Sequence, residues 1–520
     1  MDMINTNRVV IVGAGLAALY AALKLAPRPV LMISPDPLGQ GASSGWAQGG
    51  VAAAMDRADS AEAHARDTLR AGAGSVDPAI ARMVTEEART HILDLTRLGT
   101  PFDRRENGDY VLSREAAHSF ARVVRVRGDQ AGAEIMRALI AQAGATSSIQ
   151  VLEGVVATGL IRSANRVQGV RIARSNGSQT VTIDAPAVLL AGGGSGGLFA
   201  VTTNPPRIRG EVIGMAARAG AIVADAEFVQ FHPTAIDCGV DPAPLATEAL
   251  RGEGAHLINA AGERFMIDVH PDAELAPRDV VARAIYAQWR QGQRPMLDTR
   301  ACLGQRIIEE FPAVANACLN AGIDPVREPI PVAAAAHYHM GGIAVAANGR
   351  ASLEGLWVCG EASSTGLHGA NRLASNGLLE ALVFGRICAL DIRHSVTAPE
   401  QDEPPVVLPD LQPGPTAQDD LVQELRKVMT AGAGVVRNGT GLRNALREIA
   451  RIESRQSDCE TLLNMTATAT LICAAALERR ESRGAHYRDD FPDQINPAIR
   501  SRMTLDTALA MRDALLSEDV

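Results

Sequence analysis

Short apolar runs alternate with helix-like stretches over the first two hundred residues. Residues 8–12 and 30–33 are almost wholly apolar, and residues 187–191 form a third such run. Unbroken apolar runs are typical of parallel strands that are covered on both faces. The Ala- and Leu-rich stretch from residue 16 to about residue 25 predicts a helix after the first strand. We therefore expect an α/β fold with a Rossmann-like domain.

The turn between the first strand and this helix carries candidate binding chemistry. Its sequence is Gly13-Ala14-Gly15-Leu16. Gly13 allows a tight turn, and Gly15 lets a pyrophosphate approach the backbone at the positive end of the helix. We predict that a dinucleotide binds here.

The second strand departs from the usual pattern at its end. An acid commonly stands there and holds the ribose, but this chain has Ser34-Pro35, followed by Asp36. The sequence leaves open whether Ser34 or Asp36 makes that contact. A glycine-rich run at 192–197 also fits a dinucleotide pattern. However, Pro205 and Pro206 leave no room for a second long helix, so a nicotinamide cosubstrate is not expected.

Two later segments are expected to border a flavin. A strand at 355–362 brings Glu361 to its carboxyl end, where it suits a ribityl hydroxyl. A helix from about 376 to 392, capped by Ser375 or Asn376, would direct its first amides at negative charge on a reduced flavin. The alternative is a capped helix on the surface.

The pattern of apolar and polar residues along the rest of the sequence divides the chain into domains. Residues 1–224 and 339–395 are expected to form the FAD-binding domain, with an α+β capping domain inserted at 225–338. Residues 396–415 form a linker in which prolines stand at 399, 404, 405, 409, 413 and 415. Residues 416–520 are expected to form a helical bundle, with helices at 419–430, 443–456, 461–480 and 497–516.

Composition and charge remove several function classes. The 520 residues include 48 Arg but only two Lys, Lys24 and Lys427. Lysine-dependent Schiff-base chemistry is therefore improbable, and neither lysine precedes Ser or Thr as a phosphate-binding P-loop requires. The net charge of −9 argues against nucleic acid or an anionic membrane as a partner. The spacing of the seven cysteines provides no zinc site, iron–sulfur cluster or redox dithiol, so we expect no metal and a cytoplasmic protein.

Between about 225 and 340 the alternation of strand and helix patterns stops. His, Arg and acidic residues occur there in apolar surroundings. Taken singly, each such residue is more often structural than functional. Taken together, they suit a small dianion gripped by Arg and His. The segments are Phe231-His232-Pro233-Thr234, Leu245 to Gly254, Leu275-Ala276-Pro277-Arg278-Asp279 and Ala336 to Gly342, together with Arg372.

These segments resemble the succinate dehydrogenase/fumarate reductase flavoprotein family, as do Trp46-Ala47-Gln48-Gly49-Gly50 and Gly366 to Asn376. The likeness extends from about residue 8 to residues 482–486. It implies FAD as cofactor. Respiratory members carry a covalently attached histidine where this chain has Ser43, so the FAD is expected to be non-covalent. The resemblance places the cofactor at Gly13, Ala14, Gly15, Leu16, Ser34, Ser43, Ser44, Gln48, Gly49, Gly50, Glu211, Glu361, Ser375, Gly377 and Leu378.

One segment separates an amino-acid-oxidising branch of this family from the respiratory subunits. Ser113 to Ser119 resembles the Arg-Glu-Gly-Gly-His-Ser stretch of that branch, with both glycines changed to alanine. The resemblance implies that Glu115 faces the ammonium group of the substrate. Alternatively, Glu115 and His118 could pair on an exposed helical turn. Two other departures are Gly377, which is usually serine, and Glu211-Val212, where the family tends to have Asp-Gly.

The resemblance implies a reaction as well. L-aspartate is expected to bind through Arg372, His337, His232 and Thr247, with its amine near Glu115. Hydride transfer to flavin N5 would give iminoaspartate for quinolinate and NAD biosynthesis, with quinolinate synthase downstream. Either O2, giving H2O2, or fumarate, giving succinate, would reoxidise the flavin. Arg278 is expected to relay protons with Glu248 or Asp279, and His232 is a further catalytic candidate.

Three alternatives remain. The first is a fumarate reductase or succinate dehydrogenase subunit, which would need an electron-transfer partner. The second is a non-catalytic protein that binds flavin or senses a dicarboxylate. A pyridine-nucleotide disulfide reductase is disfavoured by the missing cysteine pair. The protein is expected to be a monomer or a small homo-oligomer.

Overall fold

A five-stranded parallel sheet lies at the centre of the computed structural model, which describes residues 3–397 and 403–517. The strands at 8–12, 30–33 and 187–191 are confirmed within one residue of their predicted ends. The strand expected at 355–362 is shorter, because Gly360 turns the chain at φ +66° and Glu361 lies in a 3-10 turn. In spatial order the strands are β18 (Leu356–Val358), β11 (Val188–Leu190), β2 (Val9–Val12), β3 (Val30–Ser34) and β7 (Ile149–Glu153).

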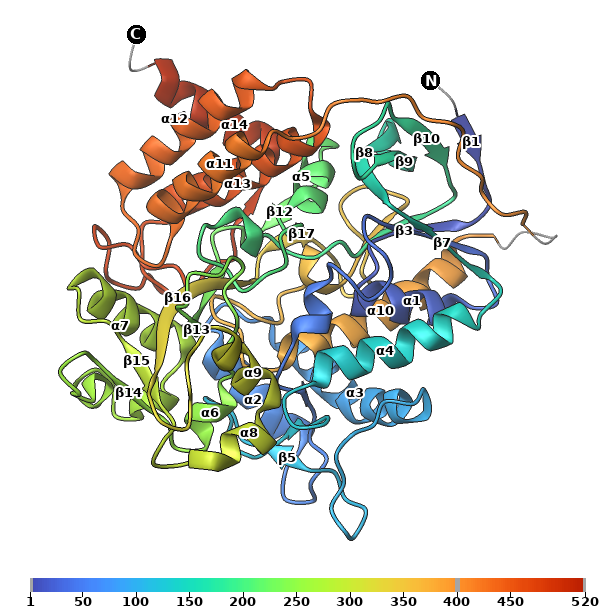
Figure 1. Cartoon of the computed structure of the whole chain (residues 1–520). Helices are drawn as coiled ribbons and strands as arrows, with labels where there is room; N and C mark the ends of the chain where they lie inside the picture. The colour runs from blue at the N-terminus through green and yellow to red at the C-terminus, as the bar shows by residue number, and fades with distance from the viewer. Residues whose placement is uncertain (1–2, 398–402, 518–520) are drawn as a thin grey trace.

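Both faces of this sheet are buried, which explains its unbroken apolar sequences. Val9 and Ile11 of β2 pack against one group of helices, whereas Val10 and Val12 pack against a second, four-stranded sheet. Figure 1 shows the first group beside the sheet. Its members are α1 (Leu16–Leu25), α3 (Pro78–Arg97), α4 (Ala131–Gly144) and α10 (Asn376–Ser395). The second sheet contains β1 (Met3–Asn5), β10 (Val181–Asp184), β9 (Arg166–Arg174) and β8 (Val155–Ser163).

No second long helix follows the glycine run at 192–197. A short 3-10 turn, Gly196–Leu198, comes first, and the next helix is α5 (Glu211–Arg218). This geometry agrees with a single dinucleotide turn.

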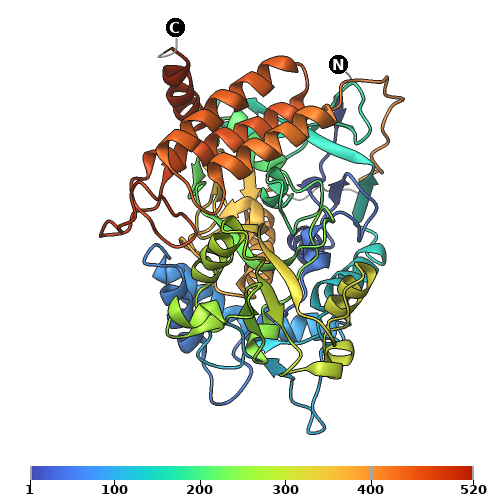
Figure 2. The same ribbon diagram turned by 60° about the vertical axis from the view of Figure 1, so that its left-hand side comes forward.

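Residues 225–338 leave the central sheet and build a separate apolar core. Two long antiparallel strands, β13 (Val229–Ile236) and β16 (Ile330–His339), carry the chain out and back. Figures 1 and 2 show this green and yellow segment below the C-terminal helices. Its other elements are β14 (His256–Ile258), β15 (Met296–Asp298), α6 (Ala249–Gly252), α7 (Arg278–Arg290), α8 (Ile307–Glu310) and α9 (Pro312–Asn320).

The C-terminal helices pack on one another and on Phe199 and Phe231. They are α11 (Asp419–Ala433), α12 (Gly439–Arg455), α13 (Glu460–Glu478) and α14 (Leu505–Ser517). The helix predicted at 497–516 is wrong in its first turns. There, β20 (Arg502–Met503) pairs with β12 (Val223–Ala224), so a tertiary strand pairing overrides the local helical pattern. Residues 403–418 contain no helix or strand and include five of the linker prolines, while Pro399 lies outside the described residues.

The remaining elements are short or peripheral. Within the described ranges, α13 is the one helix that is long and apolar enough to cross a membrane, but 78% of that stretch is buried inside the protein. The other elements are α2 (Ala61–Ala71), β4 (Val51–Ala52), β5 (Leu112–Ser113), β6 (Val123–Val124), β17 (Gly342–Ala344) and β19 (Ser363–Ser364).

Candidate active site

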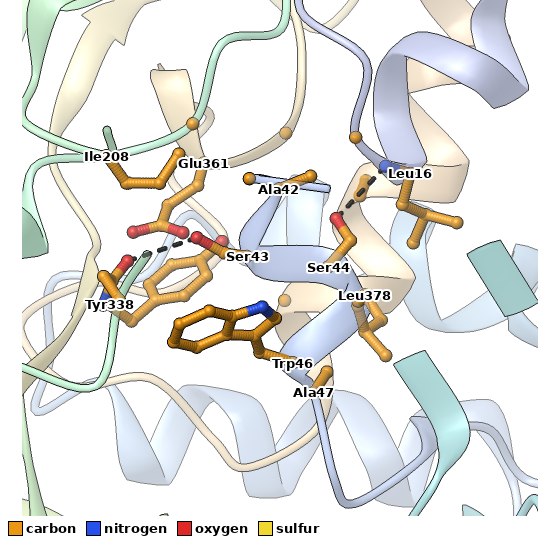
Figure 3. A pocket seen from close by; sticks show the side chains of 18 of the residues that line it. Leu16, Ala42, Ser43, Ser44, Trp46, Ala47, Ile208, Tyr338, Glu361 and Leu378 are labelled. Atoms are coloured by element: carbon orange, nitrogen blue, oxygen red, sulfur yellow. Dashed lines mark hydrogen bonds between the residues drawn. The ribbon is translucent and has the colours of Figure 1, made fainter. Parts of the chain in front are cut away.

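A cavity of about 620 Å³ runs from the carboxyl ends of the parallel strands to the inserted segment. This volume lies within the range of roughly 300–1,000 Å³ that is usual for ligand sites. All fifteen residues predicted to hold the cofactor line it, from Gly13 at one end to Leu378 at the start of α10. Figure 3 shows the side chains of Leu16, Ser43, Ser44, Glu361 and Leu378 around the same space.

The turn before α1 fits a pyrophosphate. Gly13 has φ +118°, and a Cβ there would overlap the carbonyl oxygen of Ala191. Gly15 is the N-cap of α1 and provides no side chain to cover its first amides, and the first turn contains no acid. The N–H of Leu16 donates to Ser44 Oγ at 3.1 Å, which joins this turn to the segment bearing Ser43 (Figure 3). The start of α1 can therefore accept an anion.

We expect Gly13→Ala to lose FAD. The new Cβ meets the Ala191 carbonyl in a backbone region that is almost restricted to glycine, which costs about 1–3 kcal/mol before the clash is counted. The FAD content after purification and the thermal midpoint should both fall. As the control, Gly144→Ala has open space around the new Cβ, so it should keep the FAD content and should not lower the thermal midpoint. Full FAD content in Gly13→Ala would contradict this interpretation of the turn.

Two more features favour a polar cofactor in this cavity. Gln48 Oε1 is buried and has no hydrogen-bond partner among the described residues. Glu361 accepts from the backbone N–H of His339 at 2.9 Å, and burial raises its pKa to about 7. Of the two ribose candidates, Ser34 donates its hydroxyl to the carbonyl of Asp36, while the Asp36 carboxylate pairs with Arg207 at 3.1 Å. Both residues line the cavity.

The predicted substrate residues line the same cavity at its other end. They come from the inserted segment, from the loop before α10 and from the loop at 113–119, and they are Glu115, His232, Thr247, Glu248, Arg278, His337 and Arg372. Asp279 is the exception and corrects our expectation. Its carboxylate lies outside the cavity and pairs with Arg283 at 3.0 Å, because consecutive residues at the start of α7 point in different directions.

Arg278 belongs to a buried chain of charges. Its Nε donates to Glu248 Oε2 at 2.5 Å, and the second oxygen of Glu248 lies 3.0 Å from an Arg251 nitrogen. Burial raises the pKa of Glu248, but Arg278 and Arg251 outweigh it and the pKa is lowered. Glu248 is therefore ionised, and it links a cavity arginine to one deeper in the inserted segment.

Arg372 has no such partner. It is 6% exposed, and no carboxylate of the described residues lies within 4.0 Å of its guanidinium. The guanidinium instead lies 4.4 Å from the centre of the Tyr338 ring, and its Nε makes no hydrogen bond. Burial and the nearby Arg278 lower its pKa to about 10. An unneutralised buried cation of this kind is a strong site for a carboxylate.

The rings of His232 and His337 lie edge to face, with their centres 4.9 Å apart. Burial and the charge of Arg278 hold the pKa of both well below the usual value, so both are neutral. The Nδ1 of His232 accepts from the backbone N–H of Thr234 at 3.2 Å, which leaves the proton on Nε2. His232 can thus donate a neutral hydrogen bond to a bound carboxylate.

Glu115 adds a negative group to this basic site. It is 4% exposed, and its Oε2 accepts from the Ser375 hydroxyl at 2.9 Å. Burial and the neighbouring Glu248 raise its pKa to about 6. The alternative of an exposed helical turn with His118 is wrong: His118 is also buried, and its ring contacts Arg122 and the carbonyl of Ala374. The side-chain cap expected from Ser375 or Asn376 is also wrong, since α10 has no side-chain cap.

One of the two alanines in the loop bearing Glu115 has a backbone conformation that suits glycine. Ala117 has φ +64°, a left-handed conformation that costs a residue with a Cβ roughly 1–2 kcal/mol. After allowing for the flexibility of glycine, we expect Ala117→Gly to stabilise the protein by about 0.5–1 kcal/mol in urea unfolding. Ala116, which is buried and lacks a positive φ, is the control, and Ala116→Gly should destabilise. Equal effects at both positions would contradict this assignment.

The structure also identifies residues that the sequence did not single out. Gln230 accepts from Arg278 at 3.1 Å and donates to the carbonyl of Arg372 at 2.9 Å, so it joins the two cavity arginines. Its position two residues before His232 on β13 is a signal that could have found it. Tyr338 explains the glycine at 377, because a Cβ there would lie 2.8 Å from its ring.

Comparisons with known proteins show the family of this chain. Residues 8–378 match the FAD binding domain family, and residues 457–513 match the fumarate reductase flavoprotein C-terminal family. The L-aspartate oxidase of Caulobacter vibrioides is 52% identical and covers 96% of both chains. The L-aspartate oxidase of Mesorhizobium japonicum is 47% identical over 96% of this chain and 94% of its own.

Two solved structures have a fold similar to that of this chain. FrdA of the E. coli quinol fumarate reductase superposes with a TM-score of 0.86 at 27% identity, covering 96% of this chain and 94% of its own. Sdh1 of Mycobacterium smegmatis has a TM-score of 0.79 at 29% identity, covering 95% and 90%. With its dinucleotide turn, its basic cavity and Glu115, this chain belongs to the L-aspartate oxidases of the succinate dehydrogenase/fumarate reductase flavoprotein family.

Proposed function

We propose that this chain oxidises L-aspartate to iminoaspartate with FAD, as a step toward quinolinate and NAD. One observation supports this most strongly: the cavity holds a buried carboxylate, Glu115, together with the unpaired cation Arg372. A substrate with two carboxylates and one ammonium group complements both. The experiment is the anaerobic flavin spectrum after L-aspartate is added, followed by a peroxide assay when air is admitted. An unbleached flavin would contradict the proposal.

The cavity residues fit FAD. The turn at Gly13 and Gly15 would hold the pyrophosphate, Gln48 and Glu361 offer polar groups along the cavity, and the start of α10, which has no side-chain cap, lies at the far end. FAD bound in this cavity would supply the acceptor for the hydride that leaves the substrate Cα. With Ser43 at the position of the covalent histidine, the protein holds FAD by non-covalent contacts.

The protein residues bind and orient the substrate. Arg372, His337, His232 and Thr247 hold the carboxylates, and Glu115 holds the ammonium group. A carboxylate whose pKa is near 6 can also accept the proton that the amine loses. Residues 225–338 cap the cavity. A contact that keeps this cap in place joins Asp129, which lines the cavity, to the backbone N–H groups of Ala313 and Val314 at 3.1 Å each.

Fumarate reduction is the second candidate function, and the buried chain Arg278–Glu248–Arg251 favours it. Reduction of fumarate needs a proton at one carbon. These three charged side chains can supply that proton through Arg278. We therefore propose that fumarate as well as O2 reoxidises the enzyme. A protein that reduces fumarate with a dye but does not oxidise L-aspartate would be a fumarate reductase subunit instead.

A further inference from the structure

Three segments that are distant in sequence meet at Glu115. They are the loop at 113–119, the turn at Gly49 and the residue that precedes α10. The hydroxyl of Ser375, which is 260 residues from Glu115, donates to Glu115 Oε2 at 2.9 Å. A Cβ on Gly49 would lie 2.7 Å from Glu115 Oε1 and 3.2 Å from Ser375 Oγ. Glycine at 49 therefore provides the room in which this pair forms.

Ser375 adopts an unusual backbone conformation to make this contact. Its φ is +62°, and among the described non-glycine residues with positive φ it is the one that lines the cavity. A serine at a helix N-cap commonly has an extended backbone and accepts from the helix amides. Here the left-handed backbone turns the hydroxyl away from α10, which has no side-chain cap, and toward Glu115. A left-handed backbone at a residue other than glycine costs free energy, and such strain is typical of functional sites.

We propose that Ser375 is the positioning residue for selection of the amino group: its hydroxyl holds Glu115 Oε2, so that Oε1 faces the ammonium of a bound amino dicarboxylate. This inference rests on the proposed function and refines it. Ser375 acts through Glu115 rather than on the reacting atoms. The backbone of Ser375 remains available to the cofactor.

The test compares two ligands on the FAD-loaded enzyme. α-Methyl-L-aspartate carries the ammonium and both carboxylates but no Cα hydrogen, so it binds without being oxidised. 2-Methylsuccinate lacks only the ammonium. Flavin difference spectra and calorimetry give both dissociation constants. In Ser375→Gly, which tolerates the left-handed backbone but lacks the hydroxyl, the preference for the amino ligand should fall about tenfold, as expected for a lost hydrogen bond to a charge. The affinity for 2-methylsuccinate should stay within about twofold.

A double-mutant cycle separates this role from a structural one. If Ser375 acts through Glu115, Ser375→Gly combined with Glu115→Gln should be no worse for the amino ligand than Glu115→Gln alone. Ser375→Ala provides a second variant without the hydroxyl and should lose the same preference. Additive losses, or equal weakening of both ligands, would overturn the proposal. So would a folded variant that loses FAD, since this would assign the hydroxyl to the cofactor.

The pH dependence gives a further readout. Glu248, Arg278 and Arg372 face Glu115 from the inserted segment and from the loop before α10, and their charges are unchanged in the variant. The hydrogen bond favours the ionised form of Glu115, so in Ser375→Gly the midpoint for binding of the amino ligand should move to higher pH. If wild-type flavin is bleached by L-aspartate but the variant keeps its preference, this inference alone fails. If wild-type is not bleached, the proposed function fails.

Discussion

Arg372→Leu should abolish flavin bleaching by L-aspartate. Two charge-assisted hydrogen bonds to a substrate carboxylate, worth about 1.5–3 kcal/mol each, correspond to a loss of roughly 10²–10⁴ in kcat/KM. Because no carboxylate of the described residues forms an ion pair with Arg372, a substrate carboxylate can take that place. Stopped-flow absorbance under anaerobic conditions measures the rate of bleaching.

The same reasoning predicts that this variant folds. Removing a buried cation that lacks an ion-pair partner takes away a desolvation cost, so the thermal midpoint of the substrate-free protein should stay level or rise. Arg372→Lys is the matched control: it keeps the charge but not the planar fork, and it should recover only part of the activity. An active Arg372→Leu enzyme would remove this residue from the substrate site.

Glu115→Gln should damage oxidation of L-aspartate much more than reduction of fumarate. The carboxylate is buried beside Arg278, Arg372 and Glu248, and only the amino substrate brings a cation to it. Loss of a buried charge-assisted bond predicts a fall of about tenfold to a hundredfold in kcat/KM for L-aspartate. Fumarate reduction by the dye-reduced enzyme is the comparison. Equal losses on both substrates would remove Glu115 from selectivity.

A pH profile tests the same residue. Because burial and Glu248 raise the pKa of Glu115 to about 6, kcat/KM for L-aspartate should fall as the pH drops through that value and the carboxylate becomes protonated. Glu115→Gln should lose this acid limb. A limb that persists in the variant would assign it to another group.

Much of the architecture follows from local sequence. The strands at 8–12, 30–33 and 187–191, the turn at Gly13 and the helix starting at 376 were predictable because each depends on neighbouring residues. The failures have a common cause. Residues 497–504 have a helical pattern, but pairing of β20 with β12 decides their structure. From the sequence alone, either Glu248 or Asp279 could be the partner of Arg278. In the structure Arg278 and Asp279 point in different directions from α7, so Arg278 contacts Glu248 and Asp279 pairs with Arg283.

The sequence by itself determined the chemistry: an FAD turn without a second nucleotide site, a set of His and Arg residues for a dicarboxylate, and too little lysine for Schiff-base chemistry. Tertiary structure alone decided how these groups meet. Glu115 and Ser375 are 260 positions apart, and their contact depends on space left by Gly49. Arg372 is identified as an unpaired cation only once its surroundings are known. The physical reason is that local patterns specify strands, turns and helices, whereas charge compensation and burial depend on residues that only the complete fold brings together.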